Sequence, residues 1–217
     1  MRRVLAGLGI AALAALSLMT GPSAGATPST DKATDTVGPA AFGQPVINEV
    51  ATRGPGSDQG AVFDQFVEIA NPSQTNFADI SNYQIRLYGC NNQLLQTVIV
   101  PQGTVLQPLG VGPLEQSYWV VSSIGYTGGV TNQPNAITVD VPDCGGVALF
   151  NPGGASRIDG VAFSSSVTAA LEGTPLIPQT STLDVLAPAY GRDIMSRDMN
   201  NNSLDFKLLV RSPGLPN

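Results

Sequence analysis

The residues best suited to chemistry in this chain are the acids and amides of one loop near the C-terminus, which reads Asp-Met-Asn-Asn-Asn-Ser-Leu-Asp. Four of its side chains place oxygen atoms at alternating or near-alternating positions: Asp198, Asn200, Asn202 and Asp205. Calcium prefers such hard oxygen ligands. The EF-hand pattern is not met, because no glycine follows Asn202 and Leu209 stands where the bidentate glutamate belongs. The loop either binds calcium or caps turns with its side chains, and we expect capping.

Two glutamates, Glu49 and Glu68, are the remaining carboxylates with catalytic potential. A pair of this kind can hydrolyse glycosides. However, aromatic residues make up only 6% of the chain, which disfavours a sugar-stacking cleft. We therefore interpret the pair as structural acceptors of hydrogen bonds from the backbone or from arginine, near a sheet edge.

The chain contains no histidine, which removes imidazole bases, Ser-His and Cys-His pairs and most transition-metal sites. Outside the N-terminal leader the only lysine is Lys207, in a strand-like run, which disfavours a Ser-Lys dyad. The sequence has no nucleophile elbow, P-loop or dinucleotide fingerprint. These observations predict a protein that is not an enzyme and has no cofactor other than the calcium considered above.

The N-terminus has the features of an export signal. Two arginines precede an apolar stretch from Val4 to Leu18, and Ala24-Gly25-Ala26 provides a cleavage site. This apolar stretch is short for a membrane helix, which needs about 20 residues. We predict a signal peptide at residues 1–26, a mature chain that starts at Thr27 without a membrane span, and secretion from the cell.

Two further properties of the mature chain follow. Of the 10 basic residues, two lie in the signal, so eight remain against 16 acidic residues, a net charge of −8. Because nucleic-acid binding draws on clustered Lys and Arg, we exclude nucleic acid as a direct partner. Cys90 and Cys144 are the only cysteines, and in an exported chain they are expected to form a disulfide. Closing that loop stabilises the fold by about 4 kcal/mol.

The segments that position these residues are predicted to be strands. Residues 27–44 form a flexible leader of small and polar residues, and 45–217 form one domain. In that domain Val67 and Ile69 alternate with Phe66 and Glu68, as in a half-buried strand. Similar runs at 46–51, 63–70, 83–88, 94–100, 117–122, 136–141, 147–151, 156–164 and 205–210 predict an antiparallel sandwich. Trp119 is a predicted core anchor.

The stretch from Ser165 to Arg192 has several prolines and little alternation. It predicts a long surface loop, with one helical turn near Thr168 to Glu172. Loops on a rigid scaffold often bind ligands, but they also tolerate sequence change, so both interpretations of this loop stay open.

Several motifs, taken in order, resemble those of the lamin tail domain family, and in particular its secreted bacterial members. The first two are Val46-Ile47-Asn48-Glu49-Val50 and Phe66-Val67-Glu68-Ile69-Ala70-Asn71-Pro72-Ser73. They are followed by Gly146-Val147-Ala148-Leu149-Phe150-Asn151-Pro152-Gly153, Ile158-Asp159, Glu172-Gly173-Thr174-Pro175-Leu176, Asn202-Ser203-Leu204-Asp205-Phe206 and Ser212-Pro213-Gly214-Leu215-Pro216-Asn217. The resemblance implies an all-β, immunoglobulin-like antiparallel β-sandwich over residues 45–217.

The resemblance also favours a binding task over a catalytic one. The first hypothesis is a secreted, non-catalytic module that binds an extracellular protein or a cell-surface glycan. The alternative is a carboxylate-based or calcium-assisted secreted hydrolase, or an accessory domain to a secreted nuclease or phosphatase, since the module accompanies such enzymes in this family.

Overall fold

The structure, a computed structural model, describes residues 44–54, 64–127, 137–177 and 188–217. All of them belong to one unit of the chain, residues 36–217. The predicted signal peptide and all but the last residue of the predicted leader lie outside the described residues. Within the described residues the protein consists mostly of antiparallel β-strands with almost no helix, as the sequence predicts.

The larger sheet has five antiparallel strands. Their order is β11 (Lys207–Val210), β10 (Pro188–Gly191), β1 (Val46–Ala51), β2 (Phe66–Ala70) and β7 (Tyr118–Ser122). The register between β1 and β2 shifts by one residue between Ile47 and Glu49, which leaves Asn48 as a bulge. This bulge lets Ile47 and Val50 both face the core, while Glu49 faces the other side of the sheet, directly opposite Glu68.

The smaller sheet has four antiparallel strands. Their order is β5 (Leu94–Ile99), β4 (Gln84–Tyr88), β8 (Gly146–Phe150) and β9 (Arg157–Ala162). A separate pair joins β3 (Ala78–Asp79) to β6 (Val105–Leu106). The described residues also include the 3-10 turn η2 (Leu114–Ser117) and the helical turn α1 (Asn202–Asp205).

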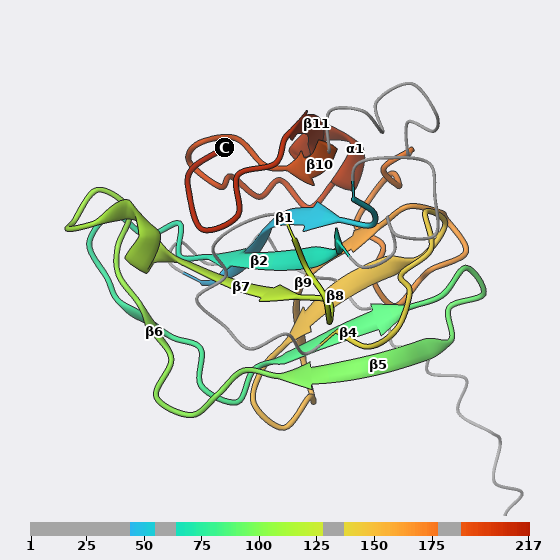
Figure 1. The fold of residues 1–217 in the computed structure, drawn as a ribbon, viewed down its shortest axis with the longest axis horizontal. Helices are drawn as coiled ribbons and strands as arrows, with labels where there is room; N and C mark the ends of the chain where they lie inside the picture. The colour runs from blue at the N-terminus through green and yellow to red at the C-terminus, as the bar shows by residue number, and fades with distance from the viewer. Residues whose placement is uncertain (1–43, 55–63, 128–136, 178–187) are drawn as a thin grey trace, which may run out of the picture. The chain divides into compact units, whose positions relative to one another are not determined.

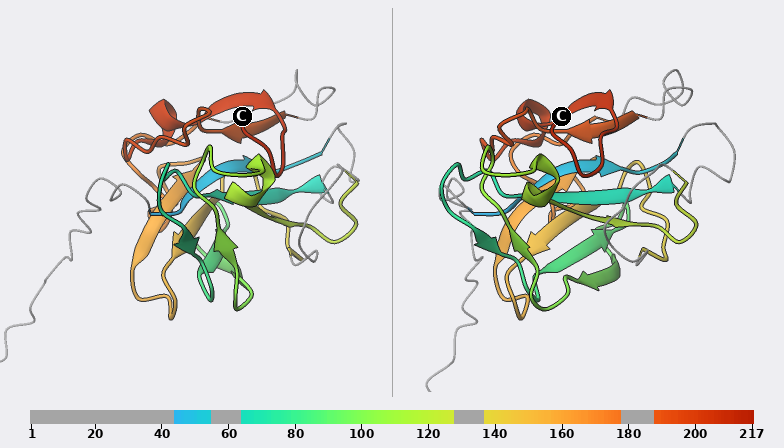
Figure 2. Two further views of the ribbon diagram at one scale, coloured as in Figure 1. Left: turned by 90° about the vertical axis from the view of Figure 1, so that its left-hand side faces the viewer. Right: turned by 60° about the vertical axis from the view of Figure 1, so that its left-hand side comes forward.

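The two large sheets share one hydrophobic core. Ile69 and Trp119 of the larger sheet and Leu87 and Leu149 of the smaller one belong to the same cluster of buried side chains. Figure 1 shows β1, β2 and β7 above β8, β4 and β5, and Figure 2 shows the same two sheets from two further sides. Burying one apolar face of each sheet is the main force that holds such layers together. Trp119 is only 3% exposed, which confirms its prediction as a core residue.

The disulfide between Cys90 and Cys144 is present, as predicted. Cys90 lies just after β4 and Cys144 just before β8, and the two strands are neighbours in the smaller sheet. Their Cα atoms are 4.8 Å apart, within the usual range for a disulfide. The bond therefore ties together two turns at one end of this sheet.

Several predicted strands have other bounds in the structure, such as 63–70, which begins at Phe66, and 156–164, which spans Arg157–Ala162, and two differ in kind. Of the strand predicted at 136–141, residue 136 lies outside the described residues, and the rest forms only an isolated parallel bridge between Ile137 and Ser123. The strand predicted at 205–210 begins at Lys207, because residues 202–205 form α1. Asn202 is buried there and its side chain bonds to other elements, so tertiary contacts favour the helical turn.

The predicted surface loop from Ser165 to Arg192 is only partly a loop. Its described part includes β10, which pairs with both β1 and β11. Val167 and Ala170 are fully buried against the smaller sheet. The helical turn predicted at 168–172 is absent: residues 168–170 form a hydrogen-bonded turn, and 171–172 are irregular. Residues 188–191 form a strand because β1 and β11 pair with them, although their own sequence does not predict a strand.

Candidate functional site

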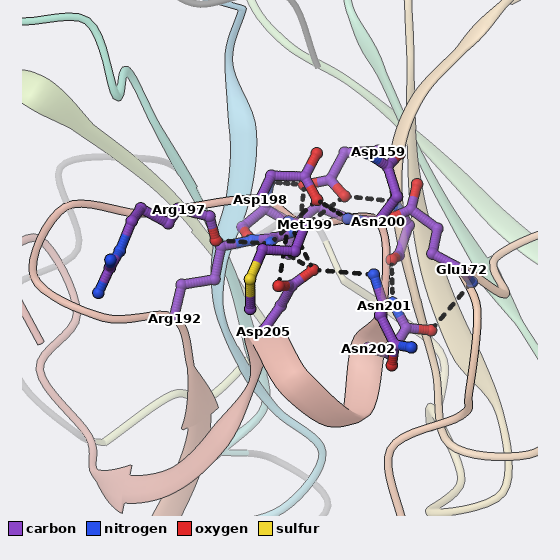
Figure 3. Close-up of polar contacts among 12 residues, drawn as sticks. Asp159, Glu172, Arg192, Arg197, Asp198, Met199, Asn200, Asn201, Asn202 and Asp205 are labelled. Atoms are coloured by element: carbon purple, nitrogen blue, oxygen red, sulfur yellow. Dashed lines mark hydrogen bonds and ion pairs between the residues drawn. The ribbon is translucent and has the colours of Figure 1, made fainter. Parts of the chain in front are cut away.

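A fully buried arginine, Arg192, lies at the centre of a cluster of charged residues. Arg192 directly follows β10, and its Nε donates a hydrogen bond to the Ile47 carbonyl at 2.8 Å. Its Nη2 bonds both oxygens of Asp159 on β9, at 2.9 and 3.1 Å, and its Nη1 lies 3.1 Å from an oxygen of Asp205. The guanidinium also stacks over the Phe206 ring, 4.5 Å from its centroid. Arg192 thus joins β1, β9 and α1. Figure 3 shows Arg192 together with Asp159, Asp198 and Asp205.

Burial and the neighbouring carboxylates act in opposite directions on the pKa of Arg192, and the carboxylates have the larger effect. Removal from water by itself lowers the pKa of Arg192. The carboxylates of Asp159, Asp198 and Asp205 raise it further than burial lowers it, so the Arg192 pKa ends above its usual value. The residue therefore carries a permanent positive charge inside the protein.

The four loop residues predicted as possible calcium ligands do not all point to one place. Asp198 Oδ1 accepts bonds from the Asn200 N–H at 2.8 Å and from Arg192 at 3.3 Å. Asp205 accepts the backbone N–H groups of Met199 and Asn201, each at 3.0 Å, besides pairing with Arg192. These are the side-chain-to-backbone bonds of the capping interpretation.

Asn202 lies apart from the other three. Its side chain is buried and accepts the N–H groups of Ala162 and Glu172 at 3.0 and 3.2 Å, while its amide donates to the Gly160 carbonyl at 2.6 Å. It therefore serves as a polar link between α1, β9 and the segment that carries Glu172. The structure brings Asp198, Asn200 and Asp205 together around one turn, without Asn202.

A second group of acids shares Asp198 with this turn and adds Asp159 and Glu172, which the sequence analysis did not consider as ligands. One carboxylate oxygen each from Asp159, Glu172 and Asp198 lies within 4.8 Å of the other two. Glu172 is 3% exposed, and neither of its oxygens has a hydrogen-bond partner among the described residues. The same holds for Asp198 Oδ2 and Asn200 Oδ1. Figure 3 shows Glu172 reaching toward Asp159 and Asp198.

The electrostatics of this group are unfavourable for three negative charges. Burial, and then the charges of Asp159 and Asp198, raise the pKa of Glu172 to about 9. Burial also raises the pKa of Asp159, although Arg192 partly offsets that effect. The sequence does carry a signal for this site, because Asp159 interrupts an apolar strand. Glu172 and Asp198 are too far along the chain for spacing to connect them with it.

Glu49 and Glu68 form a separate buried pair on the other face of the larger sheet, and both are 0% exposed. Glu49 accepts the Ser212 N–H at 3.0 Å, and Glu68 accepts the Gly214 N–H at 2.5 Å and the Asn48 amide at 2.7 Å. Burial raises the pKa of Glu49 to about 7, and burial together with the charge of Glu49 raises that of Glu68. Both accept backbone bonds, as interpreted from the sequence, but in central strands rather than near a sheet edge.

An open pocket of about 600 Å³ lies beside the Arg192 network. We call it the β10–β11 groove, since β10, α1, β11 and the loop 192–199 between β10 and α1 line it. Three of its lining side chains are large, apolar and more than half exposed: Ile194, Met199 and Leu204. Arg197 and Lys207 add positive charge to its walls. Its volume is typical of a ligand site.

No model of a protein family matches this chain, and no curated protein or solved structure matches it. The resemblance to lamin tail domains therefore rests on the sequence motifs given above. Among the described residues there is no helix that is both long enough and apolar enough to cross a membrane.

Proposed function

We propose that this chain is an exported, non-catalytic binding module that contacts an extracellular protein or a cell-surface glycan through the β10–β11 groove. The observation that carries the proposal is the groove itself. It combines exposed apolar side chains with fixed charges, the composition of a recognition surface rather than of ordinary solvent-exposed surface. The groove is also rigid at its base, because buried Arg192 holds β10 and α1 against β1 and β9.

The fold that we propose for the module is the immunoglobulin-like β-sandwich of the lamin tail domain family. Two antiparallel sheets with a common core support this assignment. The disulfide between Cys90 and Cys144 supports export, because such bonds persist in oxidising compartments. The order of the motifs in the sequence supports the family.

The hydrolase alternative is less well supported. Its best candidates, Glu49 and Glu68, are fully buried, and hydrogen bonds from the C-terminal segment engage both of them. A general acid or nucleophile must reach the bond that it cleaves. In this arrangement a substrate could contact them only after residues 212–214 had moved away.

The test of binding compares the mature protein with two variants. Leu204→Asp puts a charge into the β10–β11 groove, where Leu204 is 58% exposed. Ile99→Asp puts the same charge on β5 of the other sheet, where Ile99 is 51% exposed. Each variant is immobilised and exposed to the medium and surface extract of the producing cell, and to a glycan array. We expect one ligand that the wild type and Ile99→Asp retain and that Leu204→Asp loses.

Equal retention by all three proteins would contradict a role for the groove. A parallel screen on glycosides and phosphoesters tests the alternative function. Turnover that disappears in Glu49→Gln or Glu68→Gln, with folding intact, would overturn the non-catalytic assignment.

A further inference from the structure

We propose that Glu172, Asp198 and Asn200 supply the ligands of a binding site for one calcium ion. The nearby carboxylate of Asp159 adds negative charge to this site. This inference stands apart from the proposed function, because it concerns the interior of the domain and not the groove. It begins from Glu172. A side chain that is 97% buried holds two carboxylate oxygens without a partner among the described residues, next to two further acids.

Buried polar atoms in native proteins nearly always have a partner, and a charged group without one is costly. Four such oxygens gather around this turn: both of Glu172, Oδ2 of Asp198 and Oδ1 of Asn200. The turn also packs directly against the Glu172 segment, since a Cβ on Gly173 would come within 3.0 Å of the Asn200 carbonyl oxygen. When Glu172 is ionised, all four atoms are acceptors only, and a bound cation both satisfies them and favours that ionised form.

The spacing fits a calcium ion. Oxygens of Asp159, Glu172 and Asp198 lie within 4.8 Å of one another. Two oxygens bound to one calcium ion lie at most about 5.2 Å apart, twice the calcium–oxygen distance of about 2.6 Å, so the Glu172 and Asp198 oxygens are close enough to share an ion. Magnesium, at about 2.0–2.1 Å, holds its ligands closer together and requires strict octahedral geometry.

The balance of charged side chains around the site also favours a divalent cation. With Glu172 ionised, four carboxylates meet in this region, from Asp159, Glu172, Asp198 and Asp205, and two guanidinium groups face them, from Arg157 and Arg192. The excess of two negative charges equals the charge of one divalent cation. The ligand atoms are all oxygens, the chain has no histidine and both cysteines are in the disulfide, which favours a hard ion over a transition metal.

The ligand set differs from the one that the sequence indicates. Asp159 already accepts bonds from Ile47, Gly160 and Arg192, so it supplies charge more than free lone pairs. Asp205 is engaged by Arg192 and by two backbone N–H groups. Asp198 and Asn200 remain from the predicted loop, and Glu172 replaces the other two residues.

The test is a thermal unfolding series on the mature protein after treatment with a chelator. A ligand that binds only the native state stabilises it by mass action, so calcium at about a hundred times its Kd should raise the Tm by about 5–10 °C. Excess chelator should reverse the rise, and magnesium at the same concentration should produce a smaller one.

Three variants make the test specific. Glu172→Gln keeps the shape and removes the charge, so it should fold without calcium at least as stably as the chelated wild type and should lose the calcium response. Asp198→Asn should weaken the response. Asp193→Asn alters a neighbouring acid that pairs with Arg197 outside the cluster, and it should leave the response unchanged. An unchanged Tm of the wild type in millimolar calcium, or a full response in Glu172→Gln, would overturn the site.

Discussion

Replacing Arg192 with methionine tests whether this one residue holds the two sheets and the C-terminal elements together. Methionine has a similar length and no charge, so the change leaves the carboxylates of Asp159 and Asp205 buried without their cation. Both side chains are 0% exposed in their ion pairs with Arg192. Removing one partner of a buried ion pair costs about 3–5 kcal/mol, because the other charge stays buried and uncompensated.

The same chain offers a matched control. Arg197 pairs with Asp193, but its side chain is 74% exposed, so Arg197→Met should cost less than about 1 kcal/mol. For a domain of this size each kcal/mol lowers the Tm by about 2–4 °C. We therefore expect Arg192→Met to lower the Tm by about 6–20 °C and Arg197→Met by no more than about 4 °C.

Calorimetry and urea unfolding of both variants provide the measurement. Adding Asp159→Asn to Arg192→Met should recover part of the loss, since it removes one of the stranded charges and the two sites are directly coupled. If Arg192→Met unfolds within about 1 kcal/mol of the wild type, or no sooner than Arg197→Met, the network does not stabilise the fold as argued.

Three further predictions concern other parts of the chain. Burial raises the pKa of Glu49 from 4.5 to about 7, so its contribution to the free energy of unfolding is complete below pH 4.5 and falls by about 3 kcal/mol as the pH rises to about 7. Urea unfolding across that range should show the decline in the wild type and less of it in Glu49→Gln, and equal pH dependence would contradict the assignment. Cys90 and Cys144 should give no alkylation in the native protein and a mass gain of two protons on reduction, with a stability loss of about 4 kcal/mol, and two reactive thiols without reductant would refute this. N-terminal sequencing of protein from the medium should begin at Thr27, and a start at Met1 would contradict the predicted export signal.

The sequence predicts the central strands well because their signal is local. Val67 and Ile69 alternate with Phe66 and Glu68, and in the structure they occupy the two faces of β2. The strand is not half-buried as predicted, however, because both faces are buried and the C-terminal segment bonds to Glu68. β10 has no such signal. Its four residues form a strand because β1 and β11 pair with it on both sides, which no neighbouring residue indicates.

In the candidate site, too, some residues can be predicted from local sequence and others only from the tertiary structure. Asp198 and Asn200 stand out in the sequence because they are close together in a loop rich in acids and amides. Asp159 and Glu172 join them only through the packing of β9 against the C-terminal elements, over separations that spacing arguments do not reach. Asn202 shows the converse, since it fits the loop pattern but the fold turns its side chain into the interior.

The most direct test of the account is the number of calcium ions that one chain binds. Titration calorimetry on the chelator-treated mature protein, checked by native mass spectrometry, measures it without reference to any partner. The account predicts one calcium per wild-type chain and none per Glu172→Gln chain at the same concentrations. No binding to the wild type, or one ion retained by Glu172→Gln, would show that Glu172 is buried for another reason.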